Sequence, residues 1–91
     1  MVAKHSNKKF TVLLADRNKD NLRLMSAYLN QAKDFIVLGY AFDGRQAIDL
    51  TNKIKPDLLI IDLILPKLDC FAVLEELAAN RYNKDTKVII T

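Results

Sequence analysis

The sequence predicts an α/β fold in which a parallel sheet is covered by helices on both faces. Four short apolar runs alternate with three segments whose apolar residues recur at helical spacing. The run at 58–65 is apolar apart from Asp62, which is typical of a strand buried on both faces of a parallel sheet. A chain of 91 residues makes one small domain.

The strands are expected where apolar and β-branched residues lie between turn signals. They are Phe10 to Ala15, Phe35 to Phe42, Leu58 to Asp62 and Lys87 to Thr91. Each strand is joined to the next through a helical segment, so the crossovers should be right-handed.

Each of the three expected helices begins after a residue whose side chain can cap it. These caps are Asn18, Asp43 and Asp69, and Gln46 completes a pattern that resembles a capping box. The lysine, proline and aspartate at 55–57 end the second helix. The inward-facing stripes are expected to be Leu22, Met25, Leu29 and Ala32 in the first helix, Ala47, Leu50 and Ile54 in the second, and Phe71, Leu74, Leu77 and Ala78 in the third.

Composition and charge exclude several classes of function. Part of the net charge of +3 lies in residues 1–9, which we expect to be a basic disordered leader rather than a phosphate-binding arm. The rest of the chain is close to neutral, so no direct nucleic-acid binding is expected. No apolar run approaches transmembrane length, so no membrane partner is expected either. The single cysteine, Cys70, excludes an internal disulfide and favours a reducing, cytoplasmic compartment. A reactive thiol is the alternative role for Cys70, and it is less favoured.

Two of the expected strands are closed by an aspartate. Asp16 follows the first strand and Asp62 ends the third. Sites in α/β folds lie at the carboxyl ends of parallel strands, where two carboxylates can hold a divalent cation or serve phosphoryl chemistry. The alternative, that Asp62 only forms a turn, leaves its match with Asp16 unexplained.

The third strand and its loop resemble the phosphoacceptor segment of receiver domains from bacterial two-component response regulators. The family pattern is an apolar strand, an aspartate, two residues, methionine–proline, two residues and aspartate–glycine. Here Asp62 is followed by Leu65–Pro66 and then by Asp69–Cys70. Within the family, residues 57–77 look most like the receiver of the sporulation stage-zero A regulator.

Three further segments carry the same resemblance. The run Asp16–Arg17–Asn18 resembles the acidic pair and asparagine after the first strand of receivers. Asp43–Gly44, followed by Ala47, resembles the opening of their second helix, and Val88 to Thr91 resembles their fourth strand, which ends in threonine or serine.

The resemblance implies a flavodoxin-like (CheY-like) fold with strand order 2-1-3-4 over residues 10–91. Asp62 would accept a phosphoryl group from a histidine kinase or phosphotransfer protein, and the domain would signal by altered protein contacts without being an enzyme beyond its own phosphotransfer. Mg²⁺ would be held by Asp62, by Asp16 through water and by the main-chain carbonyl of Ile64. Thr91 would be the switch hydroxyl, unless it is only a β-former at the end of the strand.

Two departures from the family pattern bear on the site. Arg17 stands where the family has a second acid that binds the metal directly, so Mg²⁺ affinity should fall. Its guanidinium either pairs with Asp62 as a built-in cation or lies in solvent. Cys70 replaces a glycine, which is tolerable at an ordinary helix start, and Leu65 replaces methionine at nearly constant volume.

The family's fourth helix, fifth strand with its lysine and fifth helix have no counterpart in these residues. We therefore expect a receiver truncated after the fourth strand, as a natural form or as a fragment, that self-associates through the strand edge or the uncovered sheet face. The missing lysine and Arg17 favour a rival function, a phosphorylation-deficient pseudo-receiver that acts as an interaction or dimerisation domain. A phosphohydrolase with an aspartate nucleophile would need a second aspartate where Ile64 stands.

Overall fold

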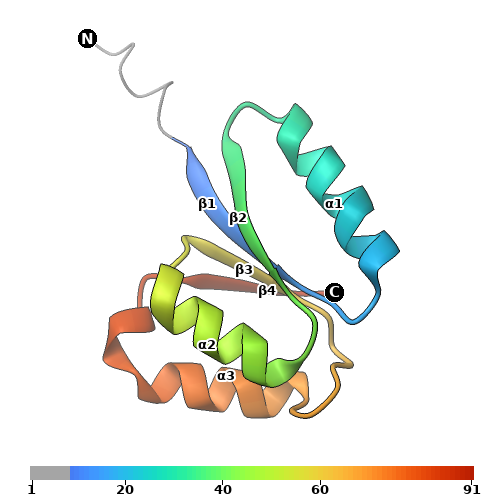
Figure 1. The fold of residues 1–91 in the computed structure, drawn as a ribbon. Helices are drawn as coiled ribbons and strands as arrows, with labels where there is room; N and C mark the ends of the chain where they lie inside the picture. The colour runs from blue at the N-terminus through green and yellow to red at the C-terminus, as the bar shows by residue number, and fades with distance from the viewer. Residues whose placement is uncertain (1–8) are drawn as a thin grey trace, which may run out of the picture.

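The structure, a computed structural model, describes residues 9–91 without the side chain of Tyr82, so the expected leader, apart from Lys9, lies outside the described residues. The elements in chain order are β1 (Phe10–Ala15), α1 (Lys19–Gln31), β2 (Phe35–Ala41), α2 (Gly44–Ile54), β3 (Leu58–Ile61), α3 (Cys70–Ala79), the short 3-10 helix η2 (Arg81–Asn83) and β4 (Lys87–Ile90). The strands form one sheet of order β2-β1-β3-β4, and every pairing is parallel (Figure 1). The predicted fold class and strand order are confirmed.

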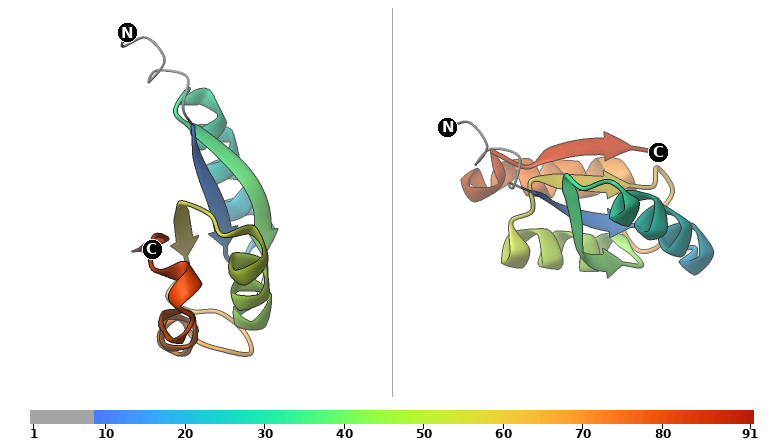
Figure 2. Two further views of the ribbon diagram at one scale, coloured as in Figure 1. Left: turned by 90° about the vertical axis from the view of Figure 1, so that its left-hand side faces the viewer. Right: turned by 90° about the horizontal axis from the view of Figure 1, so that it is seen from above.

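The helices lie on both faces of the sheet, with α1 on one face and α2 and α3 on the other (Figures 1 and 2). The core beneath α2 and α3 contains Leu13, Leu59 and Ile61. The smaller core beneath α1 contains Val12, Leu14, Leu22 and Ile60. Alternate residues of β1 and β3 point to opposite faces, so these two strands are buried on both sides and carry apolar residues throughout.

All three predicted caps are confirmed, and they set where each helix begins. The Asn18 side chain accepts a hydrogen bond from the backbone N–H of Asp20 at 2.8 Å, and the Asp69 side chain accepts one from Ala72 at 2.9 Å. At α2, Asp43 accepts from the N–H of Gln46 at 2.8 Å. The capping box is altered here, because Gln46 accepts a hydrogen bond from Phe42 rather than from the capping residue itself.

The predicted inward stripe of α3 is wrong at Phe71, whose side chain is 67 % exposed, and at Ala78, which is also exposed. The buried residues are Cys70, Val73 and Leu77, with Leu74 packed against them. Because this helix is apolar on most of its circumference, helical spacing fits two stripes, and the packing against α2 and the sheet selects one of them. Three predicted strands, β2, β3 and β4, also end one residue earlier than expected.

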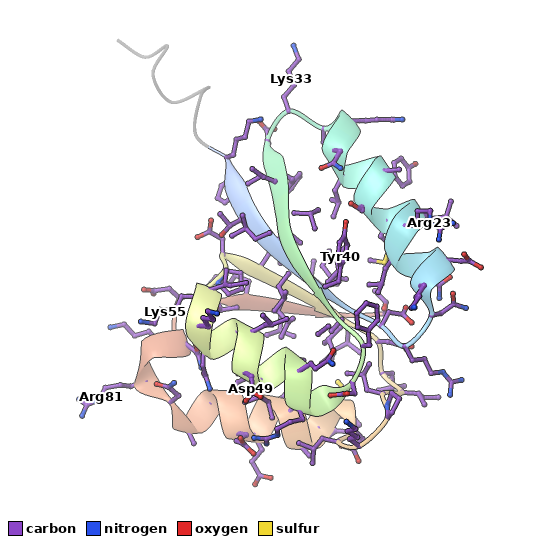
Figure 3. The ribbon with its side chains drawn as sticks, viewed as in Figure 1. Arg23, Lys33, Tyr40, Asp49, Lys55 and Arg81 are labelled. Carbon is purple, nitrogen blue, oxygen red and sulfur yellow. The ribbon has the colours of Figure 1, made fainter. Side chains whose placement is uncertain are left out.

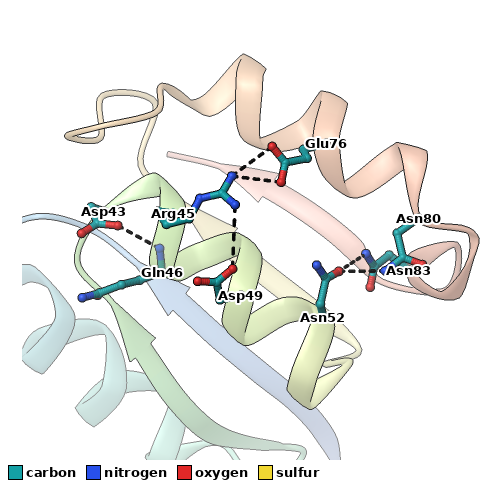
Figure 4. A network of polar contacts seen from close by, with 8 residues as sticks. All are labelled: Asp43, Arg45, Gln46, Asp49, Asn52, Glu76, Asn80 and Asn83. Carbon is teal, nitrogen blue, oxygen red and sulfur yellow. Dashed lines mark hydrogen bonds and ion pairs between the residues drawn. The ribbon is translucent and has the colours of Figure 1, made fainter.

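A polar network joins α2 to α3 and η2 on the outer side of their packed pair (Figure 4). Nη2 of Arg45 donates to both carboxylate oxygens of Glu76, at 3.0 and 2.9 Å. Asn52 accepts hydrogen bonds from the side-chain amides of Asn80 and Asn83, at 3.0 and 2.7 Å. Glu76 therefore ties α3 to α2.

Among the described elements, the other face of the sheet is covered by α1 alone. Tyr40 lies between β2 and α1, and its hydroxyl is 2.8 Å from Oγ of Ser26 (Figure 3). In the sheet as described over residues 9–91, β4 forms one edge, and Ile89, which pairs with Ile60, is 48 % exposed. Among the described residues, none of the helices is long and apolar enough to cross a membrane.

Candidate functional site

The register of the sheet places Asp16, Asp62 and Thr91 next to one another. Ala15 pairs with Ile61, and Ile61 pairs with Ile90, so the three residues follow directly after three paired positions on β1, β3 and β4. Backbone hydrogen bonds continue the pairing beyond the strands. The N–H of Asp62 donates to the Ala15 carbonyl at 2.9 Å, and the N–H of Leu63 donates to the Thr91 carbonyl at 3.2 Å.

These side chains meet in an open pocket of about 400 Å³ at the carboxyl edge of the sheet. Its lining residues are Asp16, Asn21, Leu24, Met25, Asp62 and Thr91. The structure therefore brings together three of the predicted site residues. Sequence reasoning missed Asn21, Leu24 and Met25. Their only sequence signal is helical spacing, which places Asn21 and Leu24 one turn apart and next to Asp16 once α1 is docked.

Asp16 is the more enclosed of the two carboxylates, with 5 % of its surface exposed. Its Oδ1 accepts a hydrogen bond from the N–H of Asn18 at 2.9 Å, and its Oδ2 accepts one from Nδ2 of Asn21 at 3.3 Å. A carboxylate has about four acceptor positions, so both oxygens keep capacity for another partner. The two hydrogen bonds fix the orientation of Asp16 toward the pocket.

Asp62 is half-buried, and its carboxylate can be reached from solvent through the pocket. Oδ1 accepts a hydrogen bond from the N–H of Ile64 at 3.2 Å, which turns the loop back over the end of β3. The side chain of Thr91 is exposed, and its hydroxyl donates to the Ile61 carbonyl at 3.5 Å. Hydroxyl donors usually lie about 2.7–2.8 Å from their acceptors, so this hydrogen bond is weak and easily exchanged.

Arg17 is exposed, does not line the pocket and, within residues 9–91, forms no ion pair with Asp62. Of the two positions considered for its guanidinium, the structure has the one in solvent. The backbone explains this, because residue 17 lies in the turn before the Asn18 cap, outside the hydrogen-bonded end of β1.

The loop from Asp62 to α3 is held against the start of α2. The N–H of Gly44 donates to the Pro66 carbonyl at 3.0 Å, and Nζ of Lys67 lies 3.3 Å from Oδ2 of Asp43. A Cβ added to Gly44 would come within 2.6 Å of the Leu68 Cβ, so only glycine allows this approach. Lys67 has a φ of 70°, and the Leu68 N–H donates to the Pro66 carbonyl at 2.8 Å, which together form a strained γ-turn.

Two pKa shifts accompany this loop. Hydrogen bonding from the backbone N–H of Gln46, and then the charge of Lys67, lower the pKa of Asp43 below its ordinary value of 3.8. Burial raises the pKa of the Cys70 thiol, with the Asp69 and Asp62 carboxylates adding to the effect. Cys70 is fully buried in the first turn of α3, so the thiol stays protonated at neutral pH and is inert. Its backbone does not have a positive φ, which explains why the usual glycine can be replaced.

The donor set at the pocket fits a hydrated Mg²⁺ ion. Residues 9–91 contain no group of three or more His, Cys, Asp or Glu side chains that could hold a metal. Mg²⁺ commonly uses only one or two carboxylates and fills its other positions with water and phosphate oxygens. Asp16 and Asp62 supply two carboxylates, and both reach the same open pocket.

Comparison with known protein families matches residues 12–91 to the response regulator receiver domain. The chain belongs to this family. Among solved structures, it is similar to the response regulator domain of Thermotoga maritima CheB, with 24 % identity and a TM-score of 0.83 over 91 % of this chain and 60 % of that one. It is also similar to the receiver domain of the putative response regulator NarL from Mycobacterium tuberculosis, with 26 % identity and a TM-score of 0.74 over 91 % of this chain and 65 % of that one.

A third similar structure is the isolated receiver domain of RcsB from Salmonella enterica serovar Typhimurium, determined in the presence of the phosphomimetic BeF3-. The identity is 22 % and the TM-score 0.81, over 91 % of this chain and 61 % of that one. The receiver thus spans less than two thirds of the length of each of these three relatives. At such identities the likeness to CheB and RcsB establishes the fold.

Proposed function

We propose that this receiver accepts a phosphoryl group on Asp62 and signals through altered protein contacts. The observation that carries the proposal is the shared pocket of Asp16, Asp62 and Thr91 at the carboxyl edge of the sheet. Asp62 is half-buried but opens into this pocket, so a donor can reach it, and its neighbours supply a second carboxylate and a hydroxyl. Family membership supports the same assignment.

The phosphoryl donor proposed is the phosphohistidine of a histidine kinase or phosphotransfer protein. A carboxylate oxygen of Asp62 forms a bond to phosphorus while the phosphorus–nitrogen bond breaks, and the bonding electron pair leaves with the imidazole nitrogen. The product is an acyl phosphate on Asp62 and a free histidine. A small phosphodonor that carries a good leaving group can replace the kinase in this step.

Asp16, Asp62 and the Ile64 carbonyl would hold Mg²⁺ at this site. When bound, the ion neutralises charge on the phosphoryl oxygens. Asp16 is already oriented for this role by Asn18 and Asn21, so little reorganisation is needed. Arg17 adds positive charge near the site, and we expect the affinity for Mg²⁺ to be lower than with an acid at that position.

Thr91 is the proposed switch residue. Its hydroxyl is bound only weakly to the Ile61 carbonyl, at 3.5 Å, so exchange for a phosphoryl oxygen costs little. The new charge and its acceptor oxygens would then draw β4 and the loop after β3 toward Asp62, which changes the surface offered to a partner.

The exposed edge of β4 supports self-association as a second part of this proposal. In the sheet formed by residues 9–91, Val88, Ile89 and Ile90 are exposed on an edge strand, which offers both apolar surface and backbone groups for pairing. Light scattering of the 91-residue chain over a range of concentrations tests this, and a monomer at the highest concentration would contradict it.

The lone, inert thiol supports a cytoplasmic location. The finer likeness to the sporulation regulator remains a prediction from residues 57–77.

Intact-mass spectrometry after incubation with acetyl phosphate tests the phosphoacceptor. We expect one phosphoryl adduct in the presence of Mg²⁺, much less after chelation, and none in Asp62→Asn. Asp69→Asn is the matched control, because it makes the same substitution in the same loop and asparagine caps a helix as well as aspartate does.

An adduct that persists in Asp62→Asn would assign the phosphoryl group to another residue. The absence of an adduct in the wild-type chain with Mg²⁺ would overturn the proposal in favour of the pseudo-receiver.

A further inference from the structure

Asn21 is a polar residue of the pocket to which the sequence patterns assign no role. It lies in the first turn of α1 and lines the same pocket as Asp62 and Thr91. Its Nδ2 donates to Oδ2 of Asp16 at 3.3 Å. Arg17, which occupies the position of the missing acid, is exposed and does not line this pocket. The residue that neighbours Asp16 in the pocket is therefore Asn21.

We propose that Asn21 supplies, through its carboxamide oxygen, the metal ligand that position 17 lacks. The inference rests on the proposed function, because it assumes that Asp16 and Asp62 hold a divalent cation in this pocket. Asparagine carbonyl oxygens are hard donors of the kind that Mg²⁺, Mn²⁺ and Ca²⁺ accept. Together with the Ile64 carbonyl, the ligand set becomes two carboxylates and two neutral oxygens, with water in the remaining positions.

A single rotation converts the present contact into the proposed one. The last side-chain torsion of asparagine is broad and nearly two-fold, so turning the amide plane exchanges Nδ2 and Oδ1 at small cost. Asp16 does not need to move, since its Oδ1 stays bound to the N–H of Asn18 while Oδ2 faces Asn21. Without a cation, the Asn21 amide N–H₂ faces the Asp16 carboxylate. When a cation is bound between the two side chains, the Asn21 carbonyl oxygen faces the cation instead.

The exposure and position of Asn21 favour a role in metal binding over a role in folding. Asn21 is exposed, so its amide loses little solvation when it turns, and its replacement leaves no buried hole. The Asn18 side chain caps α1 independently of the Asn21 side chain, because it accepts from the backbone N–H groups of Asp20 and Asn21. Substitution of the Asn21 side chain should therefore leave the helix intact.

Binding of Mn²⁺ alone tests the inference without any phosphotransfer. Electron paramagnetic resonance of free Mn²⁺ gives the dissociation constant for the 91-residue chain and its variants. We expect Asn21→Ala to weaken Mn²⁺ binding at least about tenfold, the lower end of what the loss of even an outer contact to a metal site costs. Asn30→Ala, the same substitution on the same helix away from the pocket, should not change the affinity. Circular dichroism checks that both variants are folded.

The variant Asn21→Asp distinguishes two roles for Asn21, a metal ligand and a hydrogen-bond donor that only orients Asp16. A carboxylate at position 21 should bind Mn²⁺ more tightly than asparagine if the side chain is a ligand. If Asn21 only donates a hydrogen bond to Asp16, an aspartate removes that donor and repels Asp16, so the affinity will not rise.

Unchanged Mn²⁺ affinity in Asn21→Ala, or no gain in Asn21→Asp, overturns the inference. If the Asp62 adduct still forms with Mg²⁺ in that case, the proposed function stands and only the role of Asn21 is wrong. A wild-type chain that neither binds Mn²⁺ nor forms the adduct overturns both.

Discussion

Within residues 9–91, the central strand β3 is closed on both faces of the sheet, whereas the neighbouring strand β4 is partly open on both. On the face beneath α2 and α3, Ile61 is fully buried, and the Arg45–Glu76 pair ties the two helices together. On the face beneath α1, Ile60 is packed in the core and is 8 % exposed. Their partners on β4, Ile90 and Ile89, are 44 % and 48 % exposed, so burial falls from the centre of the sheet to its edge on both faces alike.

Asp62 lies at the end of β3, where one set of contacts fixes the site and a pocket leaves it open. The loop that follows it is held against the start of α2, where Gly44 and Asp43 contact Pro66 and Lys67. The pocket that contains its carboxylate opens beside α1, among Asn21, Leu24 and Met25. The loop contacts thus preserve the geometry of the carboxylate, while the pocket admits a partner.

The largest expected effect comes from removing the same side-chain atoms at the centre and at the edge of the sheet. Ile61→Ala should destabilise the domain by about 2–5 kcal/mol, since it leaves a cavity in the core. Ile89→Ala should cost less than about 1 kcal/mol, since much of that side chain is already in solvent. Urea denaturation of both variants measures the two values. Equal losses would show that β3 and β4 are packed alike.

A smaller effect is expected where the loop between β3 and α3 contacts the start of α2. Gly44→Ala forces a Cβ into the Leu68 backbone and side chain, and we expect a loss of about 1–3 kcal/mol, typical of overpacking. Gly39→Ala is the control, because its Cβ would meet Leu13 and Ile54 at 3.5 and 3.7 Å, which are ordinary contact distances. Thermal unfolding should separate the two alanine variants. A stable Gly44→Ala protein would mean that the loop moves away from α2 freely.

The smallest effect is the pH dependence that Asp43 gives to the stability of the domain. Because its folded pKa is lowered, the carboxylate stabilises the fold above the ordinary pKa of 3.8, and this contribution is lost as pH falls through the folded value. Asp43→Asn keeps a capping side chain but removes the charge that faces Lys67. The stability difference between wild type and Asp43→Asn should therefore be present at pH 6 and shrink below about pH 4. Urea midpoints at several pH values measure this stability difference. A difference that does not change with pH would show that the ionisation of Asp43 does not contribute to stability.

Local chemistry in the sequence was enough to predict the order of elements, the caps and the two aspartates. Apolar runs without alternation give buried strands, and Asn18, Asp43 and Asp69 can satisfy free N–H groups only at helix starts. Once the strands are parallel, Asp16 and Asp62 must lie at the same edge. These conclusions depend on near neighbours in the chain, which is why they needed no tertiary information.

Tertiary structure decided the features that depend on contacts between distant segments. Helical spacing allowed α3 to bury Phe71, and packing against α2 and the sheet buried Cys70 and Val73 instead. The need for Gly44 comes from the Leu68 backbone and not from its own φ. The presence of Asn21 in the pocket follows from how α1 docks on the sheet. The sequence alone determined which carboxylates lie at the site, and only the docking of α1 decided which side chain stands beside them.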